Sequence, residues 1–184
     1  MASFIGFYSL SFGLFFSIFI ILYSFINLKN SEVLDKKIVS FTFIQFFFVL
    51  ISFLGLIISF VNSDFSNETV FNHSHTTKPL FYKISGTWGN HEGSLLLWLL
   101  VLTLFISIFL MKSNQQPTKY RIFTLLFQQI IIIGFFVFLI KTSSPFNYIF
   151  PKPNEGLGLN PILQDPALAI HPPILYLGYV GSSI

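Results

Sequence analysis

The chain contains no cysteine, which excludes disulfide bonds, thiolate metal ligands and thiol-exchange chemistry within it. Charged residues are scarce, at 9% of the chain, whereas a typical soluble domain has about 25%. The ten lysines and arginines are scattered, so the net charge of +3 does not indicate nucleic-acid binding. Glycine-rich phosphate loops, HExxH pairs and nucleophile elbows are also missing from the sequence. By itself the chain looks like a scaffold that presents ligands.

Apolar residues dominate what is present. They make up 53% of the chain, 26 of them phenylalanine, and the mean hydropathy is +0.75. Such a chain cannot cover itself with a polar surface, so we predict an integral membrane protein. About 20 apolar residues cross a bilayer as a helix, and four runs qualify: residues 4–26, 38–61, 94–111 and 120–140. The first run is too long for a signal peptide, so we expect it to be a retained span.

A fifth apolar run, residues 172–184, is too short to span a membrane. The chain is then a fragment, or a partner completes the bundle, or the run is a short half-helix. The predicted fold class is all-α: a single polytopic transmembrane helical bundle over residues 1–184, with four full spans plus the start of a fifth.

Basic residues distribute unequally between the connecting loops. The short loops 27–37 and 112–119, with one arginine just beyond, hold more of them than the long loops 62–93 and 141–171. The positive-inside rule therefore places the short loops in the cytoplasm or matrix. It places the N-terminus and both long loops on the outer face. The two sets are Lys29, Lys36, Lys37, Lys112, Lys119 and Arg121 against Lys78, Lys83, Lys141 and Lys152.

The first long loop ends in a polar motif that leads into the third span. Asn90 is the predicted N-cap of that span, and Glu92 then lies in its first turn, where the helix dipole favours it. His91, Leu95 and Trp98 share one helix face. Spacing alone also fits an interfacial anchor with solvated side chains, so the motif's role stays open. Its residues are Trp88, Gly89, Asn90, His91, Glu92 and Gly93.

The second long loop ends at His171, directly before Pro172 and Pro173. Prolines can open a helix but cannot continue one, and the residue before a proline avoids the helical conformation. We therefore predict that a helix begins at Pro172, with the imidazole free at its lip. Such an imidazole suits an axial haem ligand, a metal ligand, a proton relay or a quinone contact. The alternative is an interfacial histidine bonded to a backbone carbonyl.

The long loops contain two further features, a pair of histidines and two turn signals. His73 and His75 form a His-x-His pair, but two ligands are too few for a structural metal site, so no metal beyond haem iron is expected. Asn160-Pro161 and Asp165-Pro166 are turn signals.

The two loop motifs together resemble the N-terminal part of the CcmF family, the haem lyase membrane subunits of cytochrome c maturation. The resemblance extends from about Phe81 to Gly181. It is carried by KISGTWGNHEGS at 83–94, LNPILQDP at 159–166 and AIHPPILYLGYVG at 169–181.

This resemblance implies cytochrome c biogenesis in the mitochondrial inner membrane, where the gene is sometimes split, or in a bacterial plasma membrane. The haem chaperone CcmE would deliver haem b on the outer face, for covalent attachment to apocytochrome c. His171 occupies the position of one external haem ligand in the family. The remaining CcmF segments, a CcmH-like subunit and the lipid bilayer are the other implied partners, with no nucleic acid.

In the family, the tryptophan-rich WWD segment, the second external ligand and two histidines that hold a membrane haem all lie downstream of this position. None of them is in this chain, so we expect it to be inactive alone. The family transfers no catalytic role to Trp88, His91 or Glu92.

Two rival functions fit the sequence less well. A structural or proton-conducting subunit of a respiratory complex should carry ionisable residues in the middle of its spans, whereas this chain has only hydroxyls and Gln45, Gln128 and Gln129 at mid-span positions. A haem or solute transporter would need a pathway between helices, which no sequence feature specifies.

Overall fold

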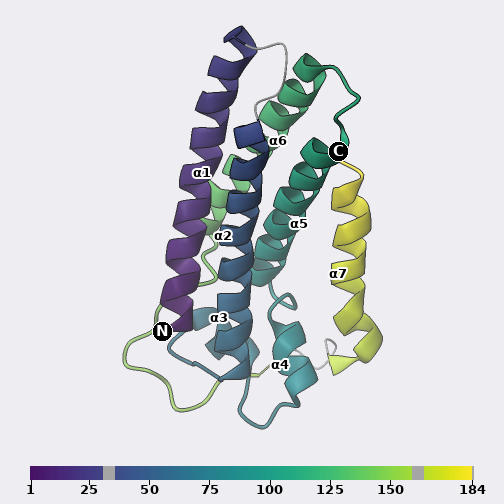
Figure 1. Ribbon diagram of the computed structural model, residues 1–184. Coiled ribbons are helices and arrows are strands. Elements are labelled where there is room, and N and C mark those ends of the chain that lie inside the picture. The colour runs from purple at the N-terminus through teal and green to yellow at the C-terminus, as the bar shows by residue number, and fades with distance from the viewer. Residues whose placement is uncertain (31–35, 159–163, 184) are drawn as a thin grey trace.

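Four long helices form the body of the protein in the computed structural model, which describes residues 1–30, 36–158 and 164–183 (Figure 1). They are α1 (Ala2–Asn30), α2 (Lys36–Val61), α5 (His91–Lys112) and α6 (Thr118–Lys141). Each is long and apolar enough to cross a membrane. The described residues contain helices and no named strand. The predicted all-α bundle with four full spans is therefore confirmed.

The four spans close into a ring. Helix α1 packs on α2 and α6, and α5 packs on the same two helices from the other side. Helix α7 (Pro166–Gly181), which includes most of the fifth apolar run, lies outside the ring and contacts α5 and the short helix α4 (Figure 1). The element that carries His171 is thus attached to one side of a closed bundle.

The side chains of the ring are arranged for a lipid environment. Large apolar residues such as Phe15, Phe47 and Phe127 are more than half exposed, whereas small hydroxyl residues such as Ser17 and Ser59 are buried between helices. In lipid the helices gain little from burying apolar surface, so close packing of small residues joins them. At Gly55, an added Cβ would lie 3.0 Å from the Ala2 carbonyl oxygen, so the backbones of α1 and α2 touch there.

Two buried glutamines join three of the spans. Gln45 on α2 donates from Nε2 to Oε1 of Gln129 on α6 over 3.1 Å, and Gln129 Nε2 donates back to Gln45 Oε1 over 2.8 Å. Ser17 on α1 donates to the same Gln129 oxygen over 2.5 Å. All three residues are fully buried. Because unpaired amides are costly away from water, this network specifies the register of the three helices.

At the short-loop end, Arg121 closes the junction between α5 and α6. Arg121 is 6% exposed, and its guanidinium donates to the Leu110 carbonyl and to Oδ1 of Asn114. A cation that hydrogen-bonds the last carbonyls of a helix stabilises that helix end. Arg121 therefore caps α5 as well as adding to the positive charge of this end.

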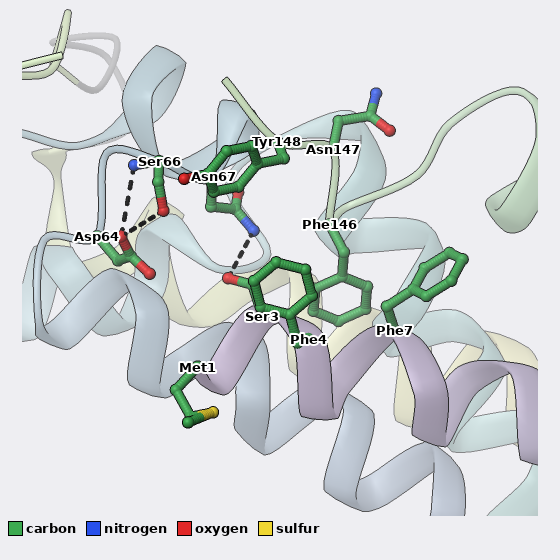
Figure 2. A pocket seen from close by; sticks show the side chains of 10 residues that line it. All are labelled: Met1, Ser3, Phe4, Phe7, Asp64, Ser66, Asn67, Phe146, Asn147 and Tyr148. Carbon is green, nitrogen blue, oxygen red and sulfur yellow. Dashed lines mark hydrogen bonds between the residues drawn. The ribbon is translucent and has the colours of Figure 1, made fainter. Parts of the chain in front are cut away.

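The N-terminus and both long loops lie together at the opposite end of the bundle (Figure 1). The segment 62–93, predicted as a loop, holds two short helices, α3 (Glu68–His73) and α4 (Leu80–Gly86). Asn67 Nδ2 donates to Ser3 Oγ over 3.1 Å and to the Pro145 carbonyl over 2.9 Å. Ser3 and Asn67 also line a cavity of about 270 Å³ beside the N-terminus, and Figure 2 shows the bond between them.

The two long loops are also bonded to each other further along. Leu157 N–H donates to the Phe71 carbonyl over 2.8 Å, and Thr76 donates from N–H and Oγ1 to the two carboxylate oxygens of Glu155. The Thr76 hydroxyl bond is the main reason why the pKa of Glu155 lies below its usual value. The loops thus form one connected layer. The predicted turn at Asn160-Pro161, together with Ile184, lies outside the described residues.

We predict that Gln45 and Gln129 are energetically coupled. Replacing Gln129 with Leu leaves the Gln45 amide unpaired and should lower the free energy of unfolding in detergent by about 1 kcal/mol. Adding Gln45→Leu should restore much of that loss, because no unpaired amide remains. Gln128→Leu is the matched control, since Gln128 donates instead to the Ser183 carbonyl. Additive losses in the Gln45/Gln129 double variant would contradict the coupling.

Candidate functional site at the long-loop end

Helix α7 begins six residues earlier than the sequence predicts. Asp165 is its N-cap, and Oδ1 accepts the N–H groups of Ala167 and Leu168 over 2.9 and 3.0 Å. Pro166 occupies the first helical position, where the missing N–H costs nothing. The predicted start at Pro172 and the predicted turn at Asp165-Pro166 are therefore wrong. The signal for the true start, an N-cap residue followed by proline, was present in the sequence.

His171 consequently lies within the helix and not before it. Helix α7 packs on α5 where Tyr176 stacks on Trp98, with ring centroids 5.5 Å apart. Ala169 is also on the buried side, at 4% exposure. Because a helix turns by about 100° per residue, His171 lies about 200° from Ala169 and faces away from the bundle.

The His171 imidazole is exposed and makes no hydrogen bond or ion pair with the described part of the chain. Ile174 and Leu175, three and four residues further along, are 63% and 49% exposed. Residues at this spacing lie on the same side of a helix as His171. The site is therefore an open imidazole on an apolar surface, without the backbone carbonyl partner that the alternative interpretation required.

Both Pro172 and Pro173 lie inside α7. Each removes the N–H that would bond the carbonyl four residues earlier, so the carbonyls of Leu168 and Ala169 lose their helical donors. The indole Nε1–H of Trp88 donates to the Ala169 carbonyl over 2.7 Å. A residue of the first motif is therefore bonded to the helix that carries the second.

Asn90 organises the first motif. Its Oδ1 accepts Gly93 N–H over 2.7 Å, which confirms the predicted N-cap, and Glu92 lies in the first turn of α5 as expected. The Asn90 Nδ2 group donates to the carbonyls of Gly86 and Thr87 over 2.7 and 3.2 Å. One side chain thus joins the end of α4 to the start of α5.

Gly93 allows this turn to close. A Cβ added at Gly93 would lie 1.6 Å from the Thr87 carbonyl oxygen, which no side chain can do without moving the backbone. Glycine is required here because the backbone approaches so closely. Gly89 lies in the same turn, and its N–H donates to the Ser85 carbonyl over 2.9 Å.

The charged and aromatic members of the motif face different surroundings. His91, the first residue of α5, is exposed, with its ring edge-to-face against Phe138 on α6 at 6.2 Å. One carboxylate oxygen of Glu92 is buried and has no hydrogen-bond partner among the described residues. The structure therefore brings Trp88 to α7 but directs His91 towards α6.

His73 and His75 take separate partners. His73 Nδ1 lies 3.0 Å from the Thr69 carbonyl oxygen, and His75 Nδ1 lies 2.9 Å from Thr77 Oγ1. Across residues 1–30, 36–158 and 164–183, no three His, Cys, Asp or Glu side chains form a group that could hold a metal ion. His75 Nε2 also lies 3.9 Å from Glu155 Oε1 in the second long loop, so the two imidazoles contact different parts of the loop layer.

The family described as "Cytochrome C assembly protein" matches residues 88–184, more than half of the chain. The chain belongs to the cytochrome c assembly family. The matched region of this family member begins at Trp88 and includes His171, so both motifs lie within it.

Individual relatives agree with this membership. The chain is 51% identical over 140 residues to the cytochrome c-type biogenesis protein CycK of Bradyrhizobium diazoefficiens, covering 76% of this chain and 21% of that protein. It is 42% identical over 148 residues to CcmF of Escherichia coli, covering 78% and 22%. A solved cytochrome c haem lyase CcmF superposes on the whole chain with a TM-score of 0.80 and 27% identity, over 29% of its own length. The predicted resemblance to CcmF is confirmed.

This cytochrome c assembly chain spans about a fifth of the length of the curated relatives named here, which are bacterial proteins. The shared part comprises the four-helix ring, the two long loops and α7, because the superposition covers all of this chain.

We predict that the Asn90 turn depends on both ends of its side chain. Asn90→Asp keeps the oxygen that caps α5 but loses the donor to α4, so it should retain part of the stability that Asn90→Ala loses. Gly93→Ala should be more damaging still, because its Cβ has no room. Thermal unfolding in detergent measures the order. Gly134→Ala is the control, since a Cβ there meets no atom within 4 Å; equal effects at Gly93 and Gly134 would contradict the close approach.

Proposed function

We propose that this chain is part of a membrane haem lyase that receives haem as a substrate at the long-loop end and helps to attach it to apocytochrome c. His171 would be one axial ligand of that haem. The observation that carries the proposal is the free, outward-facing His171 imidazole on an exposed apolar stretch of α7, within the region that matches the family.

The residues present suit this task. A neutral imidazole nitrogen is a common axial ligand of haem iron, and Ile174 beside it offers apolar surface to the macrocycle. In the attachment step, each cysteine thiol of the apocytochrome adds across a haem vinyl group. The sulfur bonds one vinyl carbon and the thiol hydrogen ends on the other, so no external oxidant is consumed. The contribution of this chain is orientation, which holds the haem in place for the thiols.

The charge distribution supports an outer-face site. More basic residues lie in the short loops than in the long ones, which favours the long-loop end on the outer side. That side is the intermembrane space for a mitochondrial inner membrane, or the periplasm for a bacterial plasma membrane; the relatives named above come from bacteria. The proposed cargo is haem b. The proposed partners are the remaining CcmF segments, CcmE as haem donor, a CcmH-like subunit and the apocytochrome; the chain is not expected to act alone.

The ligand role is tested in the assembled complex with His171→Ala. We expect haem retained in the purified complex, measured from its optical spectrum, to fall by more than about tenfold, because loss of even an outer-shell partner costs roughly 10–100-fold in metal affinity. Cytochrome c yield should fall with it. Added imidazole should restore part of the spectrum, since it can replace the missing ligand.

His75→Ala is the matched control, a second histidine at the same end, which contacts Thr77 and Glu155 in the loops. It should leave haem content unchanged. Equal haem content in the His171→Ala and unmodified complexes, at equal protein level, would refute the ligand role.

A further inference from the structure

We propose that Trp88 is a positioning residue for His171. Its indole N–H takes the place of the backbone donor that Pro173 lacks, and this bond sets the orientation of α7 at the long-loop end. The consequence for haem rests on the proposed function. The hydrogen bond itself rests on geometry alone, so the two can fail separately.

The argument begins with the helix interior. In a regular helix the N–H of residue 173 would bond the carbonyl of residue 169, but proline has no N–H to give. Ala169 is 4% exposed, so its carbonyl has little access to water. A buried carbonyl without a donor is destabilising. The Trp88 Nε1–O distance of 2.7 Å is that of a short N–H···O bond, which satisfies the carbonyl.

The donor is held firmly in place. Trp88 lies in the turn between α4 and α5, where its own N–H donates to the Ser85 carbonyl over 3.2 Å. Asn90 ties both helices to this turn, and Gly93 allows the two backbones to meet. These contacts fix the backbone that carries the indole. The motif at residues 88–93 therefore holds the Trp88 donor in position.

The acceptor, the Ala169 carbonyl, lies close enough to His171 to affect the direction of its imidazole. Helix α7 packs mainly on α5 and α4 among the described elements. Trp98 on α5 contacts the second half of α7 through Tyr176 and Tyr179, which lie beyond His171. At its far end Gly181 lies against Phe105, where an added Cβ would be 2.7 Å from the ring. At the near end the restraint is the Ala169 carbonyl, two residues before His171. Loss of the Trp88 bond should therefore let the imidazole change direction.

The test uses Trp88→Phe, which keeps an aromatic ring but removes the donor, alone and combined with Pro173→Ala, which returns a backbone N–H to the Ala169 carbonyl. Hydrogen exchange of α7 amides in the complex reports the bond without reference to haem. We expect Trp88→Phe to speed this exchange by roughly three- to tenfold, because one hydrogen bond is lost. The haem absorption spectrum should shift as well. Both effects should shrink in the Pro173→Ala background.

Tyr148→Phe is the matched control, since it also keeps a ring and removes a side-chain donor at the long-loop end, and its ring lies against Phe4 of α1 and not against α7. Its α7 exchange should stay near that of the unmodified protein. Unchanged exchange in Trp88→Phe, or an equal effect with and without Pro173→Ala, would overturn the proposal. Faster exchange that Pro173→Ala reverses, with an unshifted haem spectrum, would overturn the positioning role. If His171→Ala leaves haem binding intact, the proposed function fails whatever the exchange shows.

Discussion

The structure depends on one physical cost: a polar group that is removed from water without a partner destabilises the protein. Gln45 and Gln129 avoid this cost by bonding each other in the middle of the ring. Arg121 avoids it at the short-loop end with the Leu110 carbonyl. At the long-loop end, the Ala169 carbonyl, deprived of its donor by Pro173, is satisfied by Trp88. Partners for these polar groups thus join helices at three levels of the bundle.

This arrangement separates a rigid support from an open face. The ring of α1, α2, α5 and α6 is closed by mutual contacts, and the two long loops are bonded into one layer at one end. Helix α7 lies beside the ring and turns His171 outward. A ligand that approaches from that side meets an imidazole whose helix is fixed from behind, which suits a reaction that depends on orientation.

The buried polar groups also bear on the rival functions. A proton-conducting subunit needs ionisable residues along its path. The mid-span amides Gln45 and Gln129 instead donate to and accept from each other, which is a structural use of polarity. The family match and the CcmF superposition point in the same direction as this observation.

Rules about neighbouring residues predicted the structure correctly where its physical cause lies in neighbouring residues. The apolar runs determined the four spans, because only a helix satisfies its own backbone in lipid, and Asn90 was recognisable as an N-cap from its neighbours. The short helices α3 and α4 were missed, since they form in a layer where the two long loops bond each other. The conformation of His171 was also decided by the tertiary structure. Two adjacent prolines disfavour a helix by local rules. Trp88, which lies 81 residues before Ala169 in the chain, replaces the donor that the Ala169 carbonyl lacks. No rule about adjacent residues includes a partner at that distance.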